Sequence, residues 1–201
     1  MNYQVVLDET IKKLDYVPKL LLHACCAPCS SYVIEYLSNF FSITILYYNP
    51  NIDTEDEFNY RFSELERFIN EFKTKYPVSL VNLGYLKEEY DEIALGLENE
   101  PERGLRCLKC YELRLDKSFN YAKNYHFDYV TTTLTLSPHK NSKVINEIGK
   151  KLEEKYQFPY LYSDFKKRDG YKRSIVLSHE YSLYRQDYCG CKYSKKKKMD
   201  E

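Results

Sequence analysis

Short apolar runs alternate with longer amphipathic stretches along most of this chain. Runs rich in β-branched and aromatic residues predict strands at 20–23, 43–48, 78–83 and 127–133, with a last short one at 159–162. Apolar residues at helical spacing, bounded by capping and turn residues, predict helices at 30–40, 54–76, 88–97, 111–125, 141–156 and 170–184. Strands that alternate with helices in this way indicate an α/β fold, with a parallel sheet and helices on both of its faces.

This fold class brings several chemistry-bearing loops together. In a parallel sheet the loops that follow the strands lie at the carboxyl edge, where ligands bind. The pattern therefore predicts that the Cys25–Cys29 loop, the turn at Asn49 and the loop Ser137–Lys140 share one rim. No internal repeat or linker interrupts the sequence, so residues 1–193 are predicted to form a single α/β domain and residues 194–201 a disordered basic tail.

A formal net charge of zero hides two regions of opposite sign. Residues 53–102 hold 14 acidic and 5 basic side chains, a net charge of −9, whereas residues 103–201 hold 12 acidic and 22 basic ones, a net charge of +10. The basic region is compatible with a polyanionic partner, but on charge alone a solvated surface is the simpler explanation. The same choice applies to a dense basic stretch at 166–173.

The chain contains no run of about 20 apolar residues, and residues 1–19 include acidic and basic side chains rather than an apolar signal segment. We therefore expect a cytoplasmic protein with no membrane partner, whose thiols stay reduced. The odd number of cysteines, seven, also argues against a framework made of disulfides alone.

All of the cysteines fall into three short clusters. The clusters are Cys25, Cys26 and Cys29, then Cys107 and Cys110, then Cys189 and Cys191, the last in a C-terminal portion that is predicted to be helical. Soft thiolates at short spacing are typical of sites for zinc, copper(I) or iron–sulfur clusters. A structural zinc ion and a four-iron cluster each take four thiolates, which the second and third clusters can supply. Three thiols then remain, enough to help hold a second metal or to act as a redox nucleophile.

Local features of the first cluster leave its chemistry open. Side chains of adjacent residues point in opposite directions in an extended segment, so Cys25 and Cys26 are expected to face different centres or to bridge two of them. A helix that begins at Ser30 and Ser31 would stabilise thiolate charge with its N-terminus. The spacing of Cys26 and Cys29 also fits a dithiol–disulfide redox motif, although the other two clusters make that explanation poor.

Five blocks of this sequence resemble the QueH family of epoxyqueuosine reductases, and the resemblance covers about 19–193. The blocks, in the family's order, are Leu21–Ser30, Tyr48–Ile52, Arg106–Tyr111, Thr133–Lys140 and Tyr184–Cys191. The resemblance implies a Rossmann-like sheet related to the nucleotide α-hydrolase-like fold. It also implies a function, the reduction of epoxyqueuosine at the wobble position of tRNA to queuosine.

The resemblance further implies two cofactors, a 4Fe-4S cluster and a second, mononuclear iron beside it. Some family members have Asp at the position of Cys29, where it ligates the second iron, so this chain would offer sulfur in place of oxygen. The cysteines implied to hold the cluster, and to share ligands with that iron, are Cys25, Cys26, Cys107, Cys110, Cys189 and Cys191. Converting an epoxide to an alkene requires two electrons and the loss of oxygen as water, and the electron donor is not apparent from the sequence. A four-iron cluster usually passes one electron at a time, so the neighbouring metal is expected to bind the epoxide oxygen and help deliver the second.

Candidates for catalysis and substrate binding lie on the same rim. Asn49 and Asn51 are predicted to hydrogen-bond the modified base. His139 and Lys140 precede a helix N-terminus, where phosphate binds, and His139 is alternatively the group that protonates the leaving oxygen. A histidine in a surface turn explains His139 equally well.

Next to the third cysteine cluster, Tyr184 is predicted to stack on a base and Arg185 to meet phosphate, with Gln186 beside them. Arg185 alternatively offsets the charge of the cluster.

Two other functions remain open from the residues. The first is a zinc-stabilised RNA-binding module without redox activity, which the same thiols would serve. The second is a metal-dependent tRNA thiolation enzyme on the same fold. Such an enzyme needs a glycine-rich pyrophosphate loop after the first strand, whereas this chain has Cys-Cys-Ala-Pro-Cys at 25–29.

Overall fold

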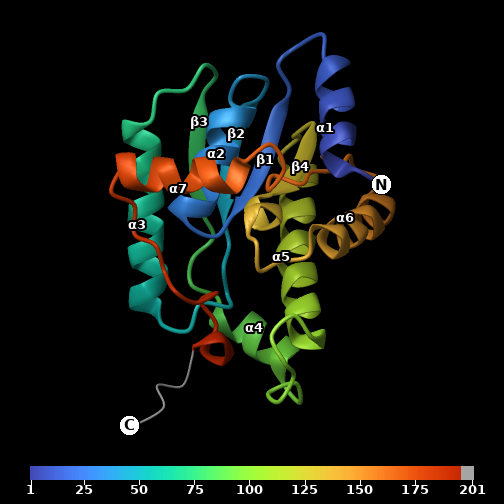
Figure 1. Cartoon of the computed structure of the whole chain (residues 1–201). Helices are drawn as coiled ribbons and strands as arrows, with labels where there is room; N and C mark the ends of the chain where they lie inside the picture. Colours follow the sequence, from blue (N-terminus) through green and yellow to red (C-terminus); the bar gives the residue numbers. More distant parts are fainter. Residues whose placement is uncertain (196–201) are drawn as a thin grey trace.

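The chain folds around a parallel four-stranded sheet in a computed structural model that describes residues 1–195 (Figure 1). The strands are β1 (Lys19–Ala24), β2 (Ser42–Tyr47), β3 (Val78–Asn82) and β4 (Tyr129–Thr132). The helices are α1 (Tyr3–Lys12), α2 (Ala27–Leu37), α3 (Glu55–Glu71), α4 (Lys87–Ala94), α5 (Leu105–Asn124), α6 (Ser142–Tyr156) and α7 (Gly170–Glu180), with short 3-10 helices η1 (Thr133–Leu136) and η2 (Lys192–Ser194). The predicted α/β fold is confirmed. Across residues 1–195, no helix is long and apolar enough to cross a membrane.

The order of the strands, β3-β2-β1-β4, is that of the first four strands of a Rossmann-type sheet. All three strand pairs are parallel, and Leu21 of β1 lies between Thr44 of β2 and Val130 of β4. The strand order reverses between β1 and β4, so the loops that follow these two strands diverge and leave a crevice at the carboxyl edge. The cysteine loop after β1 and the loop 133–140 after β4 border that crevice.

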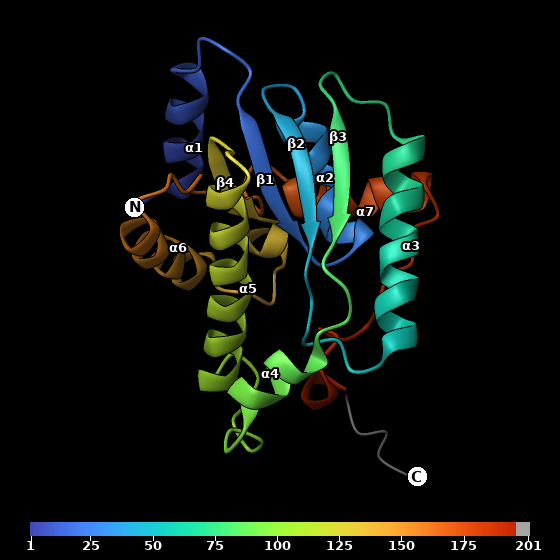
Figure 2. The same ribbon diagram turned by 180° about the vertical axis from the view of Figure 1, so that it is seen from behind.

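Helices cover both faces of the sheet (Figures 1 and 2). Successive strand residues point to opposite faces, so Leu20 and Leu22 pack on one side with α2 and α3, whereas Leu21 packs on the other with α5 and α6. Helix α7 packs against α2 rather than on the sheet itself. The two cores hold β1 rigidly, and its carboxyl end is where the first cysteine cluster begins.

Two helices begin earlier than the sequence predicts. Helix α2 starts at Ala27 instead of Ser30, because Pro28 fits the first turn of a helix, where no N–H bond is needed. The hydroxyls of Ser30 and Ser31 donate inside the helix, to the carbonyl oxygens of Cys26 (2.7 Å) and Pro28 (3.1 Å). Ser30 and Ser31 therefore do not cap α2.

Helix α5 starts at Leu105 and not at Tyr111, so Cys107 and Cys110 stand on its first turns. Tertiary contacts fix this start. Arg106 is buried, and its Nη1 donates to the carbonyl oxygens of Leu97 and Glu100 in the preceding loop, at 2.7 and 2.8 Å.

The C-terminal portion is helical only in part. Helix α7 ends at Glu180, and the third cysteine cluster lies beyond it in an irregular segment before η2. The prediction of helix to 184 is therefore wrong, since Ser182 adopts a positive φ of 49°. The predicted strand at 159–162 is a single bridge between Val130 and Tyr160. Of the predicted tail 194–201, Ser194 belongs to η2 and Lys195 pairs with Asp53 at 2.7 Å, and the rest lies outside the described residues.

Gly149 of α6 marks a close approach between this helix and the bridge residue Tyr160. A Cβ atom at Gly149 would lie 2.3 Å from the Tyr160 ring. We expect Gly149→Ala to lower the free energy of unfolding by about 1–2 kcal/mol, because overpacking outweighs the gain in helix propensity. Denaturant unfolding measures this. Lys150→Ala, at the next position with a side chain 66% exposed, should change stability by less than about 0.5 kcal/mol, and an equally small change for Gly149→Ala would contradict the packing argument.

Candidate metal centre

Three thiols gather at the carboxyl end of β1. The Sγ atoms of Cys25, Cys26 and Cys29 all lie within 4.8 Å of one another, and those of Cys25 and Cys26 are 3.8 Å apart. The backbone makes this possible because β1 ends at Ala24 and α2 begins only three residues later, with Cys26 extended between them at φ −169°. Within residues 1–195, no other set of three or more His, Cys, Asp or Glu ligand atoms is this compact. We call this set the cysteine triad.

Hydrogen bonds among the three thiols of the triad shift their pKa values in opposite directions. Hydrogen bonds from Cys26 and Cys29 hold the pKa of Cys25 well below its usual range. The same bond to Cys25 raises the pKa of Cys26 to about 12, and the pKa of Cys29 is also well above its ordinary value. One thiolate is thus shared by two thiols at the N-terminus of α2, whose dipole favours negative charge. Ligation requires thiolates, so metal binding at the triad would release the protons of Cys26 and Cys29.

The other four cysteines come together from α5 and the C-terminal segment. Cys110 and Cys191 are buried in one cluster with Tyr90 of α4. Burial raises the pKa of Cys107, and raises that of Cys110 to about 12, with Cys189 and Cys191 adding to both. Two pairs of cysteines that are about 80 residues apart in the sequence are therefore neighbours in space.

Contacts with α3 and the β2–α3 loop fix the C-terminal segment in this place. The N–H of Asp53 donates to the carbonyl oxygen of Gly190 at 2.9 Å, and Nη1 of Arg61 lies 3.5 Å from that of Cys189. Gly190 has a φ of +115°, which other residues rarely adopt, and a Cβ there would lie 3.1 Å from Arg61. Figure 1 shows the segment running from α7 along α3 to η2.

The donor set fits thiolate-bound metals. A single tetrahedral ion with metal–sulfur bonds of about 2.3 Å places neighbouring sulfurs about 3.8 Å apart. The separation of Cys25 and Cys26 Sγ has this value. The four cysteines of the second and third clusters do not form so compact a set. A four-iron cluster spreads its thiolates more widely than a single ion, because each binds a different iron.

A cavity of about 450 Å³ adjoins both cysteine groups. Its wall includes Cys25 and Cys29 of the triad and Cys189 of the other group. Such a volume is typical of pockets for small ligands. Four predicted site residues also line it: His139, Lys140, Arg185 and Gln186.

Among these four, Lys140 and Gln186 are closest to the thiols. Burial alone would lower the pKa of Lys140, but the electrostatic influence of the Cys189 and Cys25 sulfurs raises it above its ordinary value. Nε2 of Gln186 donates to Cys26 Sγ at 3.0 Å, while its Oε1 is buried without a partner in the described chain. His139 and Arg185 are exposed at the rim.

Three predicted substrate-binding residues do not line the cavity. Asn49 donates to the carbonyl oxygen of Ala24 at 2.9 Å and is almost fully buried, as is Asn51. The hydroxyl of Tyr184 bonds Glu57 at 3.3 Å. These side chains support the loops around the site, and direct contact with a base stays a prediction that their positions do not favour.

Sequence reasoning missed two arginines, Arg61 and Arg114, which are the largest fully buried side chains. Both arginines occupy sequence positions where helical spacing predicts a buried side chain. Arg61 interrupts the apolar stripe of α3 between Phe58 and Leu65, and Arg114 follows Cys110 by one helical turn, on the same face of α5.

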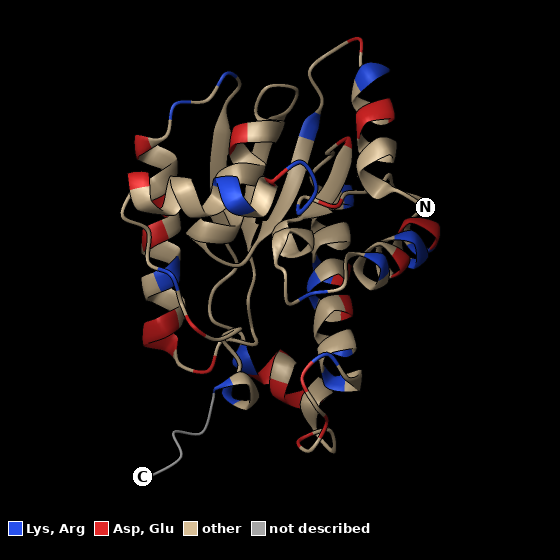
Figure 3. Ribbon diagram, viewed as in Figure 1, with Lys and Arg blue, Asp and Glu red and all other residues tan. Residues whose placement is uncertain are grey.

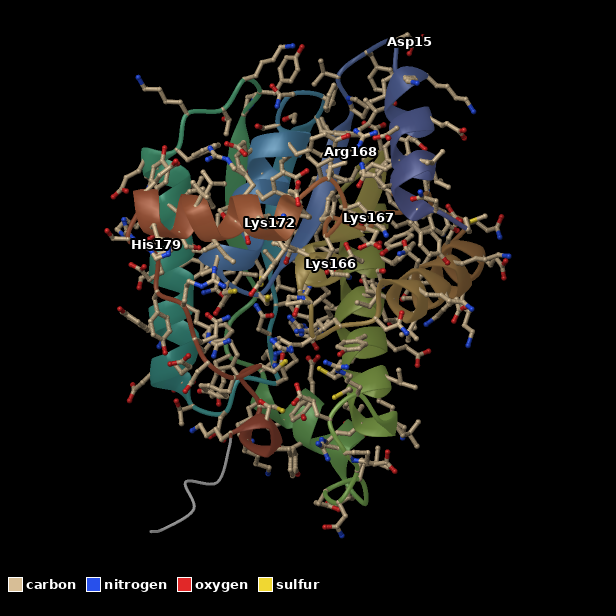
Figure 4. All side chains as sticks on the ribbon, viewed as in Figure 1. Asp15, Lys166, Lys167, Arg168, Lys172 and His179 are labelled. Atoms are coloured by element: carbon tan, nitrogen blue, oxygen red, sulfur yellow. The ribbon has the colours of Figure 1, made fainter. Side chains whose placement is uncertain are left out.

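The basic stretch 166–173 is largely paired within the chain. In Figure 4, Lys166, Lys167, Arg168 and Lys172 gather where the loop before α7 meets that helix. Figure 3 shows that acidic residues are also frequent elsewhere, for example along α3. The pairs are Lys166 with Asp164, Arg168 with Asp8, Lys172 with Asp169, and Arg173 with Glu35 and Glu180. This pairing favours a solvated face over an RNA-binding one.

Comparison with known proteins identifies the family of this chain. A family model described as epoxyqueuosine reductase QueH matches residues 20–197. A relative from Streptococcus pyogenes serotype M1, named epoxyqueuosine reductase QueH, is 44% identical over 98% of this chain and 79% of its own length. Relatives of the same name from Staphylococcus epidermidis and Thermotoga maritima are 41% and 30% identical, over 96% and 87% of this chain and 84% and 89% of their own lengths. The chain therefore belongs to the QueH family of epoxyqueuosine reductases.

Proposed function

We propose that this protein reduces the epoxide of epoxyqueuosine in tRNA to the alkene of queuosine, with a 4Fe-4S cluster and a second iron as cofactors. The reaction consumes two electrons and two protons, breaks both carbon–oxygen bonds of the epoxide and releases water. The observation that carries the proposal is that thiols of both cysteine groups, Cys25 and Cys29 on one side and Cys189 on the other, line a single cavity. A substrate in that cavity would lie next to both metal centres.

The seven cysteines suffice for both cofactors. The triad offers three ligands to one centre, and Cys107, Cys110, Cys189 and Cys191 offer four to the other, with ligands shared where the groups meet. When bound, the metals would supply electrons one at a time and a Lewis acid for the epoxide oxygen. An external donor, of unidentified nature, must provide the electrons.

The protein's own side chains would bind and orient the substrate. The sulfurs of Cys189 and Cys25 raise the pKa of Lys140 against the effect of burial, so its ammonium can donate a hydrogen bond to the oxygen that leaves. Gln186 lines the cavity, and its Oε1, which has no partner among the described residues, is available to a hydroxyl or amine of the modified base. Arg185 and His139, at the exposed rim, are placed to meet tRNA phosphates.

Metal analysis of anaerobically purified protein, followed by an assay on tRNA that carries epoxyqueuosine, tests the proposal. We expect a brown protein with about four sulfides and more than about four irons per chain, and conversion of epoxyqueuosine to queuosine once a reductant is supplied. The thiols also fit zinc. A colourless protein with stoichiometric zinc from an iron-replete preparation, inactive in the assay, would overturn the proposal in favour of a zinc-stabilised RNA-binding module.

A further inference from the structure

Arg114 is a buried cation whose side-chain hydrogen-bond partners carry no negative charge. Its side chain is 1% exposed. Its Nε donates to His23 Nε2 at 3.2 Å, and its Nη2 donates to Asn49 Oδ1 at 2.5 Å. In the part of the chain that the structure describes, no Asp or Glu forms an ion pair with Arg114.

Neither hydrogen-bond partner compensates the guanidinium. Asn49 is a neutral amide, and His23 accepts the Nε–H of Arg114 at Nε2, so neither side chain supplies a negative charge. Arg61, which with Arg114 heads the largest fully buried side chains, differs because Glu57 pairs with it at 2.7 Å. A charge removed from water is tolerated only when an opposite charge or a metal site balances it.

The groups left to balance Arg114 are sulfur atoms from both cysteine groups. Burial opposes the charge of Arg114, but the nearby sulfurs of Cys110, Cys25 and Cys189 raise its pKa, as they would in the ionised form in which they bind a metal. Cys110 lies one helical turn before Arg114 on α5, and Cys25 follows β1 directly. The guanidinium thus stands between the triad and the second group, and is fixed there by His23 and Asn49.

We infer that Arg114 is the counter-charge of the metal–thiolate centre, placed to compensate its net negative charge and to raise its reduction potential. The inference rests on the cluster that the proposed function requires. Reduction adds a negative charge to the centre, and a fixed cation in a water-poor site favours the reduced form. This role also accounts for Asn49, whose buried amide orients the guanidinium and does not line the cavity.

Redox titration of the anaerobic, iron-loaded full-length protein tests this inference without recourse to turnover. We expect Arg114→Met to lower the equilibrium constant for reduction of the cluster tenfold or more. For one electron, a tenfold change moves the midpoint potential by about 59 mV to more negative values. Arg114→Lys keeps the charge and should keep most of the potential. Lys117→Met removes the same charge from the same helix at a side chain 37% exposed, where water screens it, and should leave the potential unchanged.

Each outcome decides the matter. Equal potentials for Arg114→Met and Lys117→Met overturn the inference. Loss of the cluster in Arg114→Met but not in Arg114→Lys supports it, because charge alone then separates the variants. Loss of the cluster in both Arg114 variants overturns it, since the shape of the guanidinium would matter instead of its charge. A wild-type protein without any cluster overturns the proposed function. An unshifted potential in Arg114→Met overturns only the inference about Arg114 and leaves the proposed function standing.

Discussion

Cys29→Ala is expected to lower epoxyqueuosine reduction by at least about 10²- to 10³-fold and to remove about one iron per chain while the sulfide content stays unchanged. Cys29 belongs to the triad, with its Sγ within 4.8 Å of two other sulfurs, and it also lines the cavity. Its loss leaves two ligands at one centre and four cysteines untouched at the other. Iron and sulfide analysis, with single-turnover assays at matched protein concentration, measures both effects.

Two further variants sharpen this prediction. Cys29→Asp retains a metal ligand, with oxygen in place of sulfur, and should recover iron and part of the activity relative to Cys29→Ala. Lys172→Ala on α7 removes an exposed side chain whose one ion-pair partner within residues 1–195 is Asp169, and should change neither property. If Cys29→Ala kept both its full iron content and its activity, Cys29 would have no role in the metal centre.

Lys140→Met is expected to lower kcat/KM by about 10²- to 10⁴-fold with both cofactors in place. Lys140 lines the same cavity as Cys189 and Cys25, whose sulfurs raise its pKa, so its ammonium is placed to stabilise charge that develops on the leaving oxygen. Methionine preserves length and apolar volume while removing the charge and the donor. The effect should fall mainly on kcat, because the charge on oxygen develops only in the transition state.

The matched control is Lys143→Met, the same change three residues later at a side chain 75% exposed on the first turn of α6. It should retain near-normal kcat and KM. Absorption spectra and iron content must be equal across wild type and both variants, so that a loss of rate reports on the substrate step. A Lys140→Met enzyme with normal kcat would remove Lys140 from the chemistry and leave it a binding or structural role.

The positions of the cysteines illustrate how much of the site can be predicted from local sequence. Their grouping predicted a thiolate metal site because soft ligands at short spacing are rarely accidental. The alternation of strands and helices then placed the first cluster at the carboxyl edge of the sheet. The sequence offered Cys107, Cys110, Cys189 and Cys191 as one set of ligands, but it did not predict that the second cluster stands on a helix. The start of α5 at Leu105 depends on the contacts of Arg106 with the preceding loop.

Local periodicity, a property of short-range geometry, was therefore enough to predict the α/β class and most strands and helices. The short spacing of Cys25, Cys26 and Cys29 was enough to predict that their thiols gather. Tertiary structure decided which loops share a cavity, because that depends on the strand order β3-β2-β1-β4 and on the long-range bonds that hold Gly190 and Cys189 against α3. It also decided that Asn49 supports Arg114 and does not line the cavity. The sequence around a polar loop residue is the same whether that residue binds a substrate or a buried guanidinium. Only the packing around the residue distinguishes these two roles.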